Sequence, residues 1–413
     1  MHHPFGRKTL KIGKSRSKIA GFRSFAEMIS MRIRICTMLA IGMVLLASCR
    51  TTGKIDGTTR PSISSLKFLD SASVPYNLNY RGTIVGGLSG IDYVPGKNIY
   101  YMICDDPSAL SPARFYTAQI QISNYGIDSV SFVAVDTVWN PAGKMYPDIR
   151  KNRAHSADLE SMRYNPVRDE LIRTSEGQRV IRDTIHDLQN PDIIIMERNG
   201  HYKDSITMPA NIRVYDGAKG VRHNMTLEGI TFIKNHREFI VSVEDALYED
   251  GHSAATGDST AWIRLLHFDR DKKRQVAQYA YQIDAIPYPA NPLGAFKVNG
   301  IADILAVGND KLLVLERAWS TGRKPSDIRV YLADFRKASD ISKNTSLEKT
   351  PAKRPVGKKL VLNMESLGFT TYNIEGMTFG PDLPNGHHTL LFVSDDNFLD
   401  SQQSQFLLFE VIP

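Results

Sequence analysis

The feature that most constrains this chain is a unit that occurs five times. Each copy starts with an apolar residue followed by a small or acidic one, forms a strand, turns, and ends as a second apolar strand before an acid. The copies are LSGIDYVPGKNIYYMICDD (88–106), LESMRYNPVRDELIRTSE (159–176), LEGITFIKNHREFIVSVED (227–245), IADILAVGNDKLLVLE (301–316) and IEGMTFGPDLPNGHHTLLFVSDD (374–396). Their second residues, taken one position later in the fourth copy, lie 71, 68, 75 and 72 residues apart. Self-similarity at a nearly constant period indicates a repeat architecture.

Two more strand candidates follow each of the first four copies, and four antiparallel strands make one blade of a β-propeller. The fifth copy is followed only by QFLLFEVIP, while SSLKFLDSASV (64–74) precedes the first copy without a partner. We therefore predict an all-β, five-bladed propeller over residues 63–413, closed by an N-terminal strand that completes the last blade. A sixth blade hidden in a long connection and a pair of β-sandwich domains are the alternatives.

The segment before the repeats has the pattern of an export signal. Residues 31–49 read MRIRICTMLAIGMVLLASC, in which a basic start precedes an apolar run over 36–47. That run is too short to span a bilayer, which needs about 20 residues, but it fits the h-region of a signal peptide. Its end, Leu46-Ala47-Ser48-Cys49, resembles a bacterial lipobox. We predict a leader over 1–48, with Met31 as an alternative start, and a lipidated tether over 49–62.

This leader also explains the basic charge of the chain. The full sequence carries 51 Lys and Arg against 44 Asp and Glu. Residues 1–48 hold nine of the basic residues and one acid, so the remainder is nearly neutral, with 42 and 43. A nucleic-acid partner is therefore not expected. We expect a monomer in the bacterial cell envelope, periplasmic or surface-facing at the outer membrane, which contacts the membrane only through a lipid on Cys49.

The repeat also concentrates acids. In an antiparallel hairpin the start of the first strand and the end of the second lie at one edge, so the paired positions of each copy should meet. The expected pairs are Ser89 with Asp105, Glu160 with Glu176, Glu228 with Glu244, Asp303 with Glu316, and Glu375 with Asp395. Crowded carboxylates need compensation. Either a hard cation, best Ca²⁺, binds at this mouth of the channel, or Arg side chains and backbone N–H groups neutralise purely structural acids.

From Gly86 to Val411 the sequence resembles the phytase-like family, also described as esterase-like activity of phytase. The matching stretches include GGLSGIDYVPG, LEGITF with SVEDALYEDG, NGIADILAVGNDKLLVLERAW and NIEGMTFGPDLPNGHHTLLFVSDDNF. Two departures are Ser161, where relatives often have Gly, and Met225, where a cation is expected. The resemblance implies a propeller with ester or phosphoester hydrolase activity, and motif residues at Asp105, Asp106, Glu160, Glu176, Glu228, Glu244, Glu316, Glu375, Asp395, Asp396, Arg114, Asn299, Arg317 and Asn397.

Together these observations predict a metal-assisted hydrolase that acts on small-molecule phosphoesters or esters. The expected calcium ligands are Asp105, Glu160, Glu176, Glu244, Glu375 and Asp395. Glu228 or Glu316 would act as the base with Arg317 on the substrate, and further substrate contacts are expected from Arg114, Arg222, Asn299 and Asn397. The alternatives are a non-catalytic binding propeller with structural Ca²⁺ and a calcium-dependent lactonase-like esterase. A serine-hydrolase mechanism is disfavoured because the chain has no G-x-S-x-G elbow.

Overall fold

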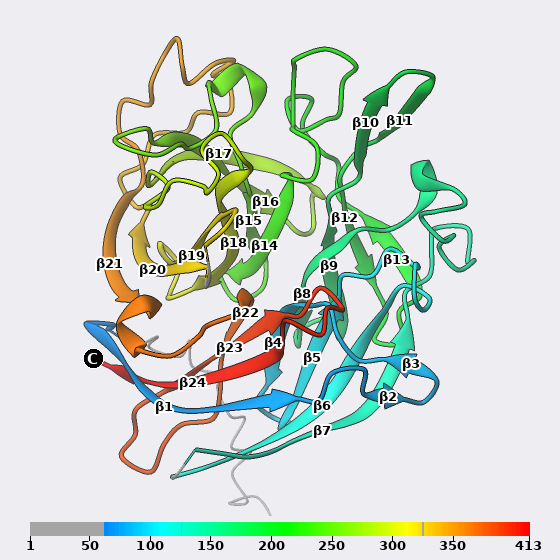
Figure 1. Cartoon of the computed structure of the whole chain (residues 1–413), viewed down its shortest axis with the longest axis vertical. Coiled ribbons are helices and arrows are strands. Elements are labelled where there is room, and N and C mark those ends of the chain that lie inside the picture. Colours follow the sequence, from blue (N-terminus) through cyan, green and yellow to red (C-terminus); the bar gives the residue numbers. More distant parts are fainter. Residues whose placement is uncertain (1–61, 125, 324–325) are drawn as a thin grey trace, which may run out of the picture. The chain divides into compact units, whose positions relative to one another are not determined.

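A computed structural model describes residues 62–124, 126–323 and 326–413. Within these ranges five four-stranded antiparallel sheets surround a common centre (Figure 1). The five-bladed propeller is thus confirmed, and no sheet of the described residues forms a sixth blade. The predicted leader, Met31, Cys49 and the tether up to residue 61 lie outside the described residues. No helix in the part that the structure describes is long and apolar enough to cross a membrane.

The first four blades run from the centre outward in chain order. Blade one contains β4 (Leu88–Val94), β5 (Ile99–Cys104), β6 (Arg114–Ser123) and β7 (Gly126–Thr137). Blade two contains β8 (Leu159–Asn165), β9 (Glu170–Ser175), β12 (Asp192–Met196) and β13 (Tyr202–Ser205). Blade three contains β14 (Leu227–Ile233), β15 (Glu238–Val243), β16 (Ala261–Asp269) and β17 (Arg274–Ile283). Blade four contains β18 (Lys297–Ala306), β19 (Lys311–Ser320), β20 (Asp327–Asp334) and β21 (Gly357–Asn363).

The fifth blade joins both ends of the propeller. It contains β22 (Asn373–Phe379), β23 (Thr389–Asp395), β24 (Ser404–Ile412) and, outermost, β1 (Ser65–Val74). Strand β1 pairs antiparallel with β24, from Ser65 opposite Ile412 to Val74 opposite Ser404. This pairing confirms the predicted closure, and it satisfies backbone groups that an open edge strand would leave unpaired.

Apolar side chains between neighbouring blades form the core. One cluster joins blades three and four through residues such as Phe239, Phe268 and Leu312, and another joins blades four and five through Leu315, Phe392 and Phe409. Cys104 is buried in the blade-one cluster, and burial raises the pKa of its thiol, as expected for an inert cysteine.

Two short hairpins lie outside the blades and were not predicted. They are β2 (Asn79–Tyr80) with β3 (Thr83–Ile84), and β10 (Gln178–Arg182) with β11 (Ile185–Gln189). Their residues are mostly polar and partly exposed, so they carry no alternating apolar signal of a half-buried strand.

A buried ion pair fills the centre of the propeller. Arg163 of β8 pairs with Asp303 of β18 at 2.9 Å, and both side chains are at most 3% exposed. Arg163 also donates to the carbonyl oxygens of Ile91, Ile304 and Met377, while Asp303 accepts from the N–H of Met377. The prediction that Asp303 pairs with Glu316 at the mouth is therefore wrong. Asp303 instead helps to join blades one, two, four and five at the axis.

Blade three meets this centre through a glycine. A Cβ on Gly229 would lie 2.7 Å from Asp303 Cα and would also collide with the backbone nitrogen of Ile304. Because backbone atoms cannot move aside cheaply, we expect Gly229→Ala to lower the free energy of unfolding by about 1–3 kcal/mol. Urea denaturation would measure this. Gly217→Ala, whose Cβ would meet nothing within 4 Å, is the matched control, and equal stabilities of the two variants would contradict the prediction.

Candidate functional site

The five blades place equivalent residues at one end of the propeller axis, which we call the mouth. In every blade an apolar residue at the start of the repeat, on the innermost strand, pairs with a residue near the end of the second strand. The pairs are Leu88 with Cys104, Leu159 with Ser175, Leu227 with Val243, Ile301 with Glu316, and Ile374 with Ser394. The residues that directly follow these partners form what we call the acidic ring. Its ten members, all described, are Ser89, Asp105, Glu160, Glu176, Glu228, Glu244, Ala302, Arg317, Glu375 and Asp395.

Blade four differs from the sequence-based alignment of the repeat. Ile301 pairs with Glu316, so Ala302 and Arg317, not Asp303 and Glu316, occupy the two ring positions. The ladder slips by one residue between Ile301 and Asp303, as it does at the same point of every other inner strand. The ring therefore contains seven carboxylates and one arginine, and blade four is its one side without an acid.

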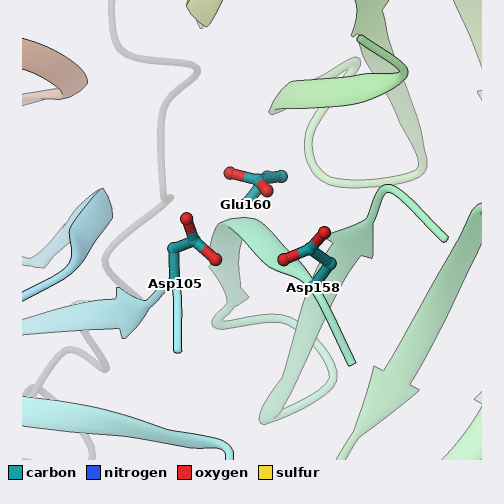
Figure 2. Close-up of side chains that lie close together, drawn as sticks. All are labelled: Asp105, Asp158 and Glu160. Carbon is teal, nitrogen blue, oxygen red and sulfur yellow. The ribbon is translucent and has the colours of Figure 1, made fainter. Parts of the chain in front are cut away.

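Two sets of three carboxylate side chains at this site lie close enough together to share a cation. Oxygen atoms of Asp105, Asp158 and Glu160 lie within 4.8 Å of one another, and so do oxygen atoms of Glu160, Glu176 and Glu228. Figure 2 shows the carboxylates of the first group gathered around a common space. Asp158 was not among the predicted ligands. The sequence could have indicated Asp158, because it stands directly before β8 and only two residues before Glu160. A loop residue at this end of the strand can reach the ring as well.

Burial and mutual repulsion make these acids hard to ionise. Burial, and then the neighbouring charges of Glu228 and Asp105, raise the pKa of Glu160 well above its usual value. Burial also raises the pKa of Glu244 to about 7, although Arg317 opposes the shift. Asp105, Glu176, Glu228 and Asp395 have pKa values shifted upward by burial and by adjacent acids in the same way. Without an added cation, these ring carboxyls are therefore harder to ionise than exposed carboxyls.

Arg317 is the only basic residue among the ten ring positions, all of which the structure describes. Its guanidinium lies 3.4 Å from Glu244 and 3.3 Å from Glu375, and it donates to Asn373. Burial would lower the pKa of Arg317, but the surrounding carboxylates raise it overall. Arg317 therefore compensates the side of the ring formed by blades three, four and five.

The opposite side of the ring has fewer donors. Gln178 donates to Asp158 at 2.9 Å, and the N–H of Thr226 donates to Glu176 at 2.5 Å. Asp105 Oδ1 is buried and has no hydrogen-bond partner among the described residues. A hard cation with oxygen ligands fits this set, because it would satisfy the unpaired oxygen and offset the clustered charge of blades one to three.

In three blades the ring acid at the end of the second strand is followed directly by another acid, and this second acid has a structural role. Asp106 pairs with Arg114 at 2.6 Å and accepts from the N–H groups of Ala109 and Ser111. Asp396 accepts from Gly87 and Phe398, and Asp245 from Ala246 and Ser253. These carboxylates stabilise turns at the rim, as short acidic side chains commonly do.

The structure does not bring all predicted site residues together. Glu316 points away from the ring and contacts Tyr281 and Lys358, each at 2.6 Å. Asn299 lies beside it in a small pocket of blade four, where it donates to the Asp284 carbonyl. Glu316 and Asn299 thus belong to a separate polar network.

The remaining predicted contacts are also engaged within the protein. Arg114 is 1% exposed and donates to Asp106, Tyr116 and the Ile84 carbonyl. Arg222 donates to the carbonyls of Ala246 and Gly251. Asn397 supports Asp395 with its backbone N–H at 2.7 Å, while its side chain reaches Gln402. Arg114 could bind a substrate only if these bonds broke, whereas the Arg222 side chain remains 22% exposed.

Comparison with protein families gives one match that covers most of the chain. The family described as Phytase-like, esterase-like activity of phytase, matches residues 83–398. This range includes all ten residues of the acidic ring and both carboxylate groups. No curated protein sequence matches the chain.

Solved structures resemble this one at the level of the fold. A thermostable family-43 glycoside hydrolase has 12% identity and a TM-score of 0.41, with 81% of this chain and 91% of that chain covered. An exo-β-1,3-galactanase from Phanerochaete chrysosporium has 10% identity and a TM-score of 0.42, with 83% and 65% covered. A gluconolactonase from Xanthomonas campestris has 8% identity and a TM-score of 0.33, with 85% and 99% covered. Similarities this distant carry no argument about activity.

Proposed function

Since this chain belongs to the phytase-like family of esterase-like propellers, we propose that it is a cation-assisted hydrolase of phosphoesters or esters. The observation that carries the proposal is the acidic ring together with the adjoining Asp158. Their carboxylates form two triads that share Glu160, and Arg317 is the single arginine of the ring. Buried acids that raise the pKa values of one another cluster at functional sites, and this supports the proposal.

Calcium is the cation we propose, with Asp105, Asp158, Glu160 and Glu176 as the residues that would hold it. All four offer oxygen atoms, the ligands that Ca²⁺ prefers. When bound, the ion would supply an electrophile for the ester oxygen and acidify a bound water. Asp105 supports this choice, because its Oδ1 is buried without a hydrogen-bond partner in the described part of the chain.

Arg317 and Glu228 would carry the remaining steps. Arg317 would bind the anionic group of the substrate, since its guanidinium is 17% exposed and already oriented by Glu244, Glu375 and Asn373. Glu228 would accept the proton of the attacking water as the bond to the leaving group breaks. Burial and the charges of Glu244 and Glu176 raise the pKa of Glu228, which makes its ionised carboxylate a stronger proton acceptor than an exposed one. Glu316 is a poorer candidate for the base because Lys358 and Tyr281 hold its carboxylate.

The experiment is a hydrolysis assay with 4-nitrophenyl phosphate and 4-nitrophenyl acetate, in Ca²⁺ or in chelator. We expect release of 4-nitrophenol that requires calcium and that Glu228→Gln lowers through kcat. Glu348→Gln, which changes an exposed acid, is the matched control and should keep full activity. If calcium binds but neither ester is hydrolysed, the non-catalytic binding propeller with a structural ion replaces this proposal.

A further inference from the structure

Blade four carries an exposed apolar surface beside the acidic ring. Leu293 is 85% exposed, Phe296 60% and Trp319 36%, and the rings of Phe296 and Trp319 are 5.8 Å apart. Exposed apolar side chains gathered in one place often mark a binding site. We call these three residues the apolar wall.

The apolar wall is continuous with the ring. Trp319 stands two residues after Arg317 on β19, with no slip in the ladder between them. Residues two apart on a strand share one face, so Trp319 lies on the same face as Arg317 and farther toward the rim. The adjacent ring position of blade four is Ala302. An organic group entering the mouth therefore meets acids on every blade except this one.

Hydrogen bonds hold the wall in place. The segment that carries Leu293 and Phe296 is joined to the end of β19 by three bonds: Ser320 Oγ to the Tyr288 carbonyl, Thr321 Oγ1 to the Phe296 carbonyl, and the Asn291 N–H to the Thr321 carbonyl, each at 2.8 Å. Apolar side chains on such a braced loop are preorganised, so little conformational entropy is lost when a ligand covers them.

We propose that Trp319 and Phe296 form a subsite for an aromatic or similarly flat, apolar ring of the substrate. This inference rests on the proposed function and narrows it to esters of an anionic acid with a ring-bearing organic group. Arg317 would hold the anionic end, and the ring would stack on Trp319. Stacking against an aromatic side chain favours offset, face-on contact and adds to the burial of apolar area.

The test measures binding rather than turnover. Benzylphosphonate and methylphosphonate are probes that share the anionic group and differ in the ring, and neither has an ester bond to hydrolyse. In saturating Ca²⁺, calorimetry should show that Trp319→Ala weakens benzylphosphonate binding about tenfold and changes methylphosphonate binding less than about twofold. Trp319→Phe should restore most of the affinity. Trp262→Phe, which alters a tryptophan of blade three, is the control and should change neither.

Each other outcome contradicts the subsite. Equal losses for both probes would mean that Trp319 only supports Arg317, and no loss would mean that the wall does not contact the ligand. Two further results would give the apolar wall another role, if Trp319→Ala leaves benzylphosphonate binding unchanged. One is sedimentation with phospholipid vesicles that depends on Trp319, which would indicate a membrane contact. The other is a dimer in solution that depends on Trp319, which would indicate an interface between two copies of the chain. The proposed function fails separately, since absent hydrolysis of 4-nitrophenyl phosphate would leave a positive binding result standing.

Discussion

Replacing Glu160 by glutamine should weaken calcium binding about a hundredfold and make the calcium-free protein more stable. Glu160 is the one residue that belongs to both carboxylate triads, so its neutralisation removes a ligand from each. In the absence of the ion, the same carboxylate only repels Glu228, Asp105 and Glu176. Titration calorimetry would measure the affinity, and thermal unfolding in chelator would measure the stability.

The same reasoning fixes the pH dependence of the calcium-free wild type. A carboxyl whose pKa is higher in the folded than in the unfolded state binds more protons when folded, so stability falls as pH rises between the two values. For Glu244 that window runs from its ordinary value of 4.5 to about 7. We expect the melting temperature in chelator to drop across this range, and calcium to restore it most at the upper end.

Glu348→Gln is the control for both measurements, because it removes one exposed acid outside the ring. It should leave calcium affinity and the pH profile unchanged. A calcium-free Glu160→Gln protein that melts below the wild type at pH 8 would contradict the idea that the ring acids repel one another.

The second large effect concerns the ion pair at the propeller axis. We expect Asp303→Ala to lower the free energy of unfolding by about 3–5 kcal/mol, because it leaves the Arg163 guanidinium buried without its charge partner. Arg163 contacts blades one, four and five, so the loss should reduce the cooperativity of the whole propeller. Urea denaturation followed by circular dichroism would measure both the midpoint and the slope.

Two further variants separate charge from packing at this position. The double variant Arg163→Met/Asp303→Leu removes both charges and fills their space with apolar side chains of similar volume. It should lower the free energy of unfolding by less than the sum of the two single changes. Arg336→Ala breaks a pair with Asp334 in which the arginine is 58% exposed, and it should leave the midpoint unchanged. Additive single-variant effects would contradict a coupled pair at the axis.

The repeat made most of the fold predictable. Each copy encodes two neighbouring strands, and the unmatched strand over 64–74 indicated how the last blade closes, because it supplies the fourth strand that the fifth copy lacks. The hairpins β2–β3 and β10–β11 were not predicted, since their polar residues bear no periodic apolar signal. Along the ring, the fixed offset between paired strands also predicted that Glu160 lies close to Glu176 and Glu228 close to Glu244.

The chemistry of blade four could not be read in the same way. The slip in the ladder is common to all five inner strands, so the feature that sets blade four apart is the pairing of Ile301 with Glu316. This pairing leaves Ala302 and Arg317 at the ring, while Asp303 lies at the axis and Glu316 in a separate network. An assigned register that is wrong by one residue moves every side chain to the other face, and the repeat alone did not fix the register of blade four. The sequence by itself determined five blades, their closure and a concentration of acids at one mouth. Only the tertiary structure decided which acids lie close enough to share a cation and which ion pair fills the axis, because those contacts join residues from different blades. It also placed an apolar wall on the non-acidic side of the mouth, where the segment with Phe296 folds against the end of β19.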